Sequence, residues 1–110
     1  MGVAICADSS EPSHPEAYAT LGATVYAAGV FLNDEWYATD VPRLMDYAAR
    51  FRMLTLMANH ADSVGTHVSV GKSAAWGPGG ALLAQAKGVE RALVIATSTN
   101  SGWRGDVVAI

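Results

Sequence analysis

The chain has 110 residues, of which 51% are hydrophobic and 15% are charged, and its formal net charge is −3. This length allows one domain over residues 1–110, and the apolar content is sufficient for a buried core. The weak negative charge and scattered basic residues argue against a nucleic-acid partner. The low charged fraction indicates that part of the surface is covered by another polypeptide.

The cysteine content and the longest apolar run bear on where the protein works. The single cysteine, Cys6, excludes an internal disulfide and fits a reducing cytosol. No basic segment precedes the first apolar residues, so we expect no signal peptide. The longest apolar run, residues 22–32, is shorter than the roughly 20 residues needed to cross a bilayer. We therefore expect a soluble, cytoplasmic protein that binds no membrane.

The first predicted element is a short buried strand over residues 2–5 that runs directly into Cys6. Acidic, hydroxyl and proline residues follow, which are typical of a sharp turn. A thiol at a strand end is held by a rigid element and can lie near the next helix N-terminus, whose dipole favours the thiolate. Cys6 is therefore a candidate nucleophile. The alternative is that it is a small buried hydrophobic residue.

A first helix is predicted over residues 14–21. Ser13 and Glu16 have the spacing of a capping box, and Gly22 can supply a left-handed stop. The inner face is expected to carry Ala17, Tyr18 and Leu21. The continuous apolar run over residues 23–32 then predicts a second buried strand beside the first.

Residues 33–37 are polar and aromatic, and they predict a loop near the mouth of any active site. Trp36 could form a pocket wall there, although packing is an alternative role. A second helix is predicted over residues 40–52, with Asp40 as its cap and Pro42 in its first turn. Its apolar face is expected to carry Leu44, Tyr47, Ala48 and Phe51, which recur at helical spacing.

The remainder of the chain predicts strands. A third strand is expected over residues 53–59, and short strand pieces at residues 68–70 and 73–76. Residues 81–86 and 91–97 are interpreted as a hairpin pair. Residues 100–105 are polar and residues 107–110 form an apolar tail that could pair with another chain.

Two other kinds of site are weighed and set aside. Gly71-Lys72-Ser73 resembles the end of a phosphate-binding loop, but Gly65 is separated from Gly71 by five residues where four are required. The histidines, His14, His60 and His67, have no metal-ligand spacing with one another or with Cys6. We expect structural or surface roles for them and no metal or cofactor. A pairing of Cys6 with His60 stays open.

Several motifs, taken in order, resemble those of the nitrilase, or carbon–nitrogen hydrolase, superfamily. They are the strand with Cys6-Ala7-Asp8, Pro15-Glu16, Gly22-Ala23, Ala58-Asn59, Gly71-Lys72-Ser73 and Gly77-Pro78-Gly79-Gly80. The resemblance implies an α/β fold, the C-terminal half of a four-layer α-β-β-α sandwich, in which a mixed sheet carries two helices on one face. The chain departs from the family at residues 47–51, where only Ala48 of the pattern Arg-Ala-any-Glu-Asn is kept.

The resemblance also implies a reaction and a set of site residues. Cys6 matches the nucleophile that attacks a small-molecule amide or nitrile and forms a thioester, and the Ala7 N–H matches an oxyanion donor. Asn59 matches the strand end beside the pocket, to which Trp36 is added as a candidate wall. The glutamate base and the lysine of the family lie upstream of the cysteine and match nothing in this chain.

The chain is therefore expected to be incomplete as a carbon–nitrogen hydrolase. Half of the sandwich would leave sheet edges and an apolar face uncovered, and such surfaces find partners. We expect either a homo-oligomer or association with a separately encoded N-terminal half. The alternative is a non-catalytic remnant that acts as an assembly or binding module.

Overall fold

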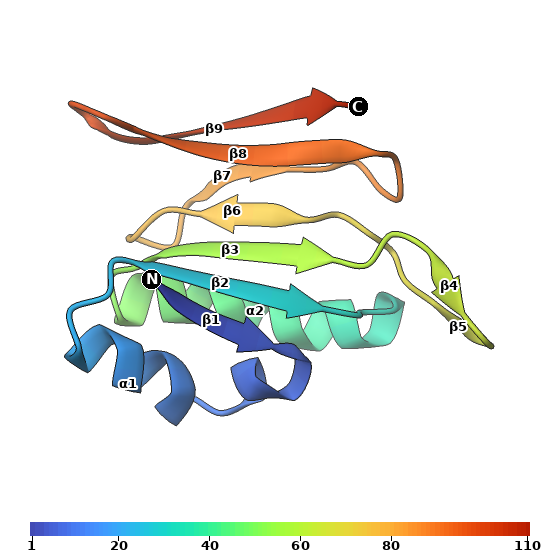
Figure 1. Ribbon diagram of the computed structural model, residues 1–110, viewed down its shortest axis with the longest axis horizontal. Helices are drawn as coiled ribbons and strands as arrows, with labels where there is room; N and C mark the ends of the chain where they lie inside the picture. Colours follow the sequence, from blue (N-terminus) through green and yellow to red (C-terminus); the bar gives the residue numbers. More distant parts are fainter.

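The computed structural model describes residues 1–110, except for the side chains of residues 63, 64 and 67, so the role expected for His67 lies outside the described side chains. Its centre is a five-stranded sheet in the order β1, β2, β3, β6, β7 (Figure 1). The strands are β1 (Gly2–Ile5), β2 (Val25–Val30), β3 (Leu54–Asn59), β6 (Ala74–Trp76) and β7 (Leu82–Gln85). The first three are parallel, and β6 and β7 continue the sheet in antiparallel pairs. The predicted mixed sheet is confirmed.

Two helices, α1 (Ser13–Thr20) and α2 (Asp34–Arg50), cover one face of this sheet (Figure 1). The ring of Tyr26 on β2 lies 6.3 Å from that of Tyr18 on α1 and 6.2 Å from that of Tyr47 on α2. Both helices therefore pack on the same side of β2, as the α/β class with two helices on one face predicts.

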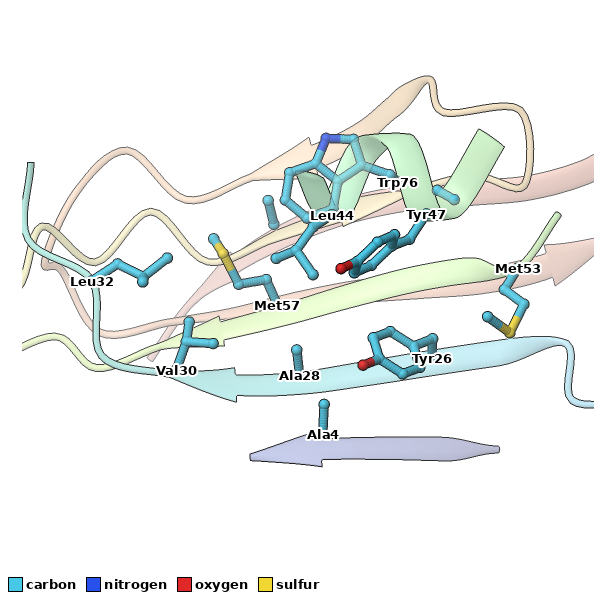
Figure 2. Packing of buried hydrophobic residues seen from close by; sticks show 12 residues of the cluster. Ala4, Tyr26, Ala28, Val30, Leu32, Leu44, Tyr47, Met53, Met57 and Trp76 are labelled. Carbon is cyan, nitrogen blue, oxygen red and sulfur yellow. The ribbon is translucent and has the colours of Figure 1, made fainter. Parts of the chain in front are cut away.

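The hydrophobic core lies between α2 and the sheet (Figure 2). Leu44, Tyr47 and Ala48 are buried and Phe51 packs against them, which confirms the predicted apolar face. Side chains of a strand alternate between faces, so alternate strand residues point into this core. They are Ala4, Tyr26, Ala28, Val30, Met57, Ala74 and Trp76.

The first helix has the predicted position but a different start and a different inner face. Its N-cap position is Pro12 and no side chain caps it, so the expected capping box is wrong because Ser13 already lies inside the helix. Pro15 is buried, whereas Leu21 is 82% exposed. Tyr18 packs at Gly2, where an added Cβ would lie 2.4 Å from the ring. The contact with a glycine in β1, rather than helical periodicity alone, sets the buried face. Of the other expected inner residues, Ala17 is also exposed.

The second helix begins six residues before the predicted cap. The Asn33 side chain accepts a hydrogen bond from the Trp36 N–H at 2.8 Å, so the residues expected to form a loop are the first turn of α2. Asp34 and Glu35 add negative charge there, which the helix dipole favours. Asp40 is consequently not a cap, and Pro42 lies in the helix interior.

The C-terminal strands pair differently from the prediction. The strands β8 (Ala92–Thr99) and β9 (Gly102–Ala109) form a hairpin with each other, and β7 pairs with β6. The expected hairpin of residues 81–86 with 91–97 is therefore wrong, and the apolar tail largely pairs within the chain. Gly105 allows the hairpin to approach β7, since a Cβ there would lie 2.6 Å from the Leu83 backbone. A separate short ladder joins β4 (Ser63–Val64) and β5 (His67–Val68).

The sheet face opposite the helices is apolar and open. Val3 is 50% exposed and Ile5 is 72% exposed on β1, and Gly29 and Ala58 are exposed on the neighbouring strands. A cavity of about 390 Å³ lies between this face and β8. None of the described helices is long and apolar enough to cross a membrane.

Candidate functional site

The carboxyl ends of β1 and β2 meet at one edge of the sheet and, with α2, enclose a cavity of about 320 Å³. Parallel strands bring the residues that follow them together at that edge, which is where open α/β sheets bind ligands. The cavity is lined by Cys6, Ala7, Ser10, Val30, Phe31, Leu32, Trp36 and Asp40. Cys6, Ala7 and Trp36 were all expected at a site, and the structure brings them together.

Cys6 is exposed and lies in the turn immediately after β1. Its φ of 51° is in the left-handed region, which costs a non-glycine residue about 1–2 kcal/mol. It is the first residue of the 3-10 helix η1 (Cys6–Ser10). A strained residue of this kind persists only where its surroundings hold it, and such residues cluster at functional sites.

Three hydrogen bonds hold this turn. The Asp8 carboxylate accepts the Ile5 N–H at 3.1 Å, across the cysteine. The Ser9 hydroxyl donates to the Cys6 carbonyl at 3.0 Å, and the Tyr47 hydroxyl donates to the Ser9 carbonyl at 2.8 Å. The bond from Tyr47 is buried, and the bond from Ser9 is partly buried.

Burial also fixes the protonation state of these tyrosines. It raises the pKa of the Tyr47 hydroxyl, and the pKa of Tyr26 is raised by burial and, to a lesser extent, by Tyr47 and Asp8. Both phenols are therefore neutral at physiological pH, and Tyr47 keeps the proton that it donates to the turn.

Apolar and aromatic side chains make up most of the cavity wall. Phe31 and Leu32 follow β2, and Trp36 stands in the first turn of α2. The charged side chain among the lining residues is Asp40, which accepts a hydrogen bond from Arg43 at 3.1 Å. The sequence indicated Trp36, but Asp40 was assigned to a cap because the helix start was misplaced.

Asn59 lies at the end of β3, outside the Cys6 cavity, and lines a neighbouring one. Its side-chain oxygen accepts the Leu32 N–H at 2.8 Å, and its amide donates to the carbonyls of Leu32 at 3.2 Å and Gly71 at 2.7 Å. Asn59 is 7% exposed. It therefore supports the cavity wall at Leu32 and does not line the Cys6 cavity itself.

His14 and His60 lie outside the lining of the Cys6 cavity. His60 is exposed and its ring lies 5.3 Å from that of Phe31, outside the lining of the Cys6 cavity. His14 bonds the Tyr26 hydroxyl at 2.9 Å in the core. Among the described residues, no three His, Cys, Asp or Glu side chains gather as metal ligands would.

Comparison with known proteins gives matches in structure. At the level of sequence, no family model and no curated protein matches the chain. The NitN amidase from Nesterenkonia sp. AN1 is 29% identical to this chain. The match covers 80% of this chain and 34% of the amidase, with a TM-score of 0.70. Nit3 of Saccharomyces cerevisiae, from branch 10 of the nitrilase superfamily, is 20% identical to this chain. That match covers 77% of this chain and 32% of Nit3, with a TM-score of 0.71.

A mutant of the Nesterenkonia amidase matches almost all of this chain. The match covers 98% of this chain and 36% of that chain at 22% identity and a TM-score of 0.70. That structure shows covalent addition of the acetamide moiety of fluoroacetamide at the active site cysteine.

These matches and the strand order identify the class of protein. The chain has the fold of the nitrilase superfamily, and the solved structures that share this fold are amidases and carbon–nitrogen hydrolases. It spans about a third of the length of the solved structures that it matches.

Proposed function

We propose that this chain supplies the nucleophile and the acyl pocket of a carbon–nitrogen hydrolase acting on small amides or nitriles. The observation that carries the proposal is the placement of Cys6, exposed in a left-handed turn at the carboxyl edge of a parallel sheet and facing an apolar cavity. The match to amidases of the same fold supports it.

The proposed reaction on an amide proceeds through a thioester. The Cys6 thiolate attacks the carbonyl carbon, a C–S bond forms, and the electron pair of the C=O bond moves onto oxygen, where the Ala7 N–H can donate. The oxyanion collapses, the C–N bond breaks, and the nitrogen takes a proton and leaves as ammonia or an amine. Water then cleaves the thioester, releasing the acid and the thiol.

The general base and a cationic oxyanion donor are assigned to polypeptide outside these 110 residues. No Lys or Glu is found among the described residues that line the Cys6 cavity, and Asp40 is paired with Arg43. General acid–base help is worth roughly 10²–10⁴-fold in rate. We therefore expect the chain alone to form the acyl-enzyme and to release it slowly.

The polypeptide that completes the site is a second copy of this chain or an N-terminal half of the same fold. The open apolar face around Val3 and Ile5 supports such an association, as does the share of the matched structures that the chain spans. A cytoplasmic location is proposed because a free, exposed thiol is maintained there in its reduced form.

A second candidate is a non-catalytic remnant that keeps the fold for assembly or binding. The lack of a Lys or Glu among the described residues of the cavity favours this candidate. The two candidates differ in one chemical step, because only the hydrolase requires Cys6 to accept an acyl group.

Acyl transfer from an activated ester tests the proposal. The chain is incubated with p-nitrophenyl acetate, quenched in acid, digested and examined by mass spectrometry. The hydrolase predicts an acetyl group on the Cys6 peptide, formed faster than on an unstructured peptide of residues 2–12. Cys6→Ala is the control for acetylation elsewhere. Acetylation of the folded chain no faster than that of the peptide would support the remnant.

A further inference from the structure

We propose that Ser9 and Tyr47 are positioning residues that orient the Ala7 N–H toward the oxyanion. This inference rests on the proposed roles of Cys6 and Ala7. It identifies two side chains that touch neither the thiol nor the substrate and that act through the backbone of the turn.

The planar peptide group between Cys6 and Ala7 links the Cys6 carbonyl to the Ala7 N–H. The Cys6 carbonyl and the Ala7 N–H belong to one rigid plane and point in opposite directions. A group that fixes the carbonyl therefore fixes the N–H as well. The Ser9 hydroxyl donates to the Cys6 carbonyl oxygen at 3.0 Å, at the edge of the peptide plane opposite the Ala7 N–H.

A second hydrogen bond connects Ser9 to the core. Its carbonyl accepts from the Tyr47 hydroxyl at 2.8 Å, and Tyr47 is held within the buried layer between α2 and the sheet (Figure 2). The Tyr47 ring contacts Tyr26 edge to face and lies 6.0 Å from Phe51. The turn is thereby fastened to α2 by a bond between residues 38 positions apart.

The backbone at Cys6 is strained. Cys6 holds a positive φ that an L-residue adopts at a cost, so a looser turn would let the plane rotate toward commoner conformations. Rotation would move the Ala7 N–H away from a developing oxyanion while leaving the thiol exposed. The consequence is specific: reactions that build an oxyanion should slow, and reactions that need only the thiolate should not.

Two reagents separate these cases. With p-nitrophenyl acetate, the thiolate attacks the ester carbonyl, an oxyanion forms, and the C–O bond breaks to release p-nitrophenolate. With iodoacetamide, the thiolate displaces iodide at a saturated carbon, the C–S bond forms as the C–I bond breaks, and no oxyanion arises. The ratio of the two rate constants measures oxyanion stabilisation independently of thiol exposure and ionisation.

The variants are Ser9→Ala and Tyr47→Phe, and the matched control is Tyr26→Phe. Tyr26 is also fully buried with a bonded hydroxyl, but that bond goes to His14 and not to the turn. Complete loss of an oxyanion donor costs about 10²–10³-fold. Misalignment is expected to lower the ratio by about tenfold in both variants, since the donor is displaced and not deleted. The control should keep the wild-type ratio.

Thermal unfolding of each variant is followed by circular dichroism, so that rates are compared below the unfolding transition. A ratio lowered in Ser9→Ala and Tyr47→Phe but unchanged in Tyr26→Phe supports the positioning role. Wild-type ratios in both variants would overturn it while leaving the role of Cys6 intact. Failure of the wild-type chain to accept the acetyl group faster than the peptide of residues 2–12 would overturn both proposals together.

Discussion

Cys6 combines an exposed thiol with a backbone conformation that most residues avoid. Its φ of 51° follows a regular strand, and the bonds from Asp8 and Ser9 hold the turn on both sides of it. The strain is local, so it can be measured by substitution at this one position.

Replacing Cys6 by Gly and by Ala should give different stabilities. Glycine adopts a positive φ without a steric cost, whereas alanine still bears that cost. The greater backbone entropy of glycine in the unfolded chain offsets part of this gain. Cys6→Gly should therefore be more stable than Cys6→Ala by about 0.5–1 kcal/mol. Urea unfolding of the two variants measures the difference. An alanine variant equal to or more stable than the glycine variant would show that the turn is unstrained.

The residues of the turn were predictable to different degrees from the sequence. Cys6 was indicated by the strand that ends at it and by the family pattern, and Ala7 by the family pattern alone. Ser9 and Tyr47 were not, because their bonds join the turn to a helix far along the chain. Tyr47 was correctly placed on the apolar face of α2, and a buried tyrosine hydroxyl needs a partner, but the sequence does not identify which.

Among the elements, α2 shows how a capping signal can be misassigned. Both Asn33 and Asp40 are good cap residues, and the apolar face was predicted from Leu44 onward, whereas Tyr37 and Val41 also pack against the core in the structure. In the structure the helix is capped by Asn33, so Trp36 and Asp40 both belong to α2 and line the cavity. Strand pairing at the C-terminus was missed for a similar reason, since periodicity predicts strands but not their partners.

The cap assignment can be tested with two alanine substitutions. Asn33→Ala removes the bond to the Trp36 N–H and should destabilise the chain by about 1 kcal/mol. Asp40→Ala removes a partly exposed pair with Arg43 and should cost less than about 0.5 kcal/mol. Denaturant unfolding of both variants gives the comparison. The opposite order of the two effects would favour a helix that begins at Asp40.

The end of β3 depends on the Asn59 amide. Asn59→Ala removes three buried hydrogen bonds and leaves the N–H and carbonyl of Leu32 without this partner, so we expect a loss of about 2–4 kcal/mol. Asn100→Ala, in an exposed turn, should change stability by less than about 0.5 kcal/mol. Equal effects of the two substitutions in thermal unfolding would contradict the bracing role of Asn59.

For the whole molecule, the uncovered sheet face sets the expected behaviour in solution. Exposed apolar surface on β1 drives association, so the chain should sediment as a species larger than a monomer at micromolar concentration. Val3→Lys with Ile5→Lys should shift it toward the monomer, whereas Val89→Lys, in the exposed loop between β7 and β8, should not. A well-dispersed monomer of the unmodified chain in sedimentation velocity would contradict the proposed association.

The architecture as a whole was the most predictable feature. The family resemblance predicted a mixed sheet with two helices on one face, and the structure has that form. The order of motifs resembled that of the nitrilase superfamily, and solved structures from that superfamily share the fold of this chain. The reactivity of the site could not be read in the same way, because it depends on the geometry of a single turn.

The central claim is that the fold makes Cys6 a reactive nucleophile, and its alkylation rate tests this most directly. The second-order rate constant for iodoacetamide at pH 7 is measured for the folded chain and for the unstructured peptide of residues 2–12, which carries the same cysteine in the same local sequence. Because Cys6 is exposed, access does not limit the comparison. The account predicts faster alkylation of the folded chain; an equal or slower rate would contradict it.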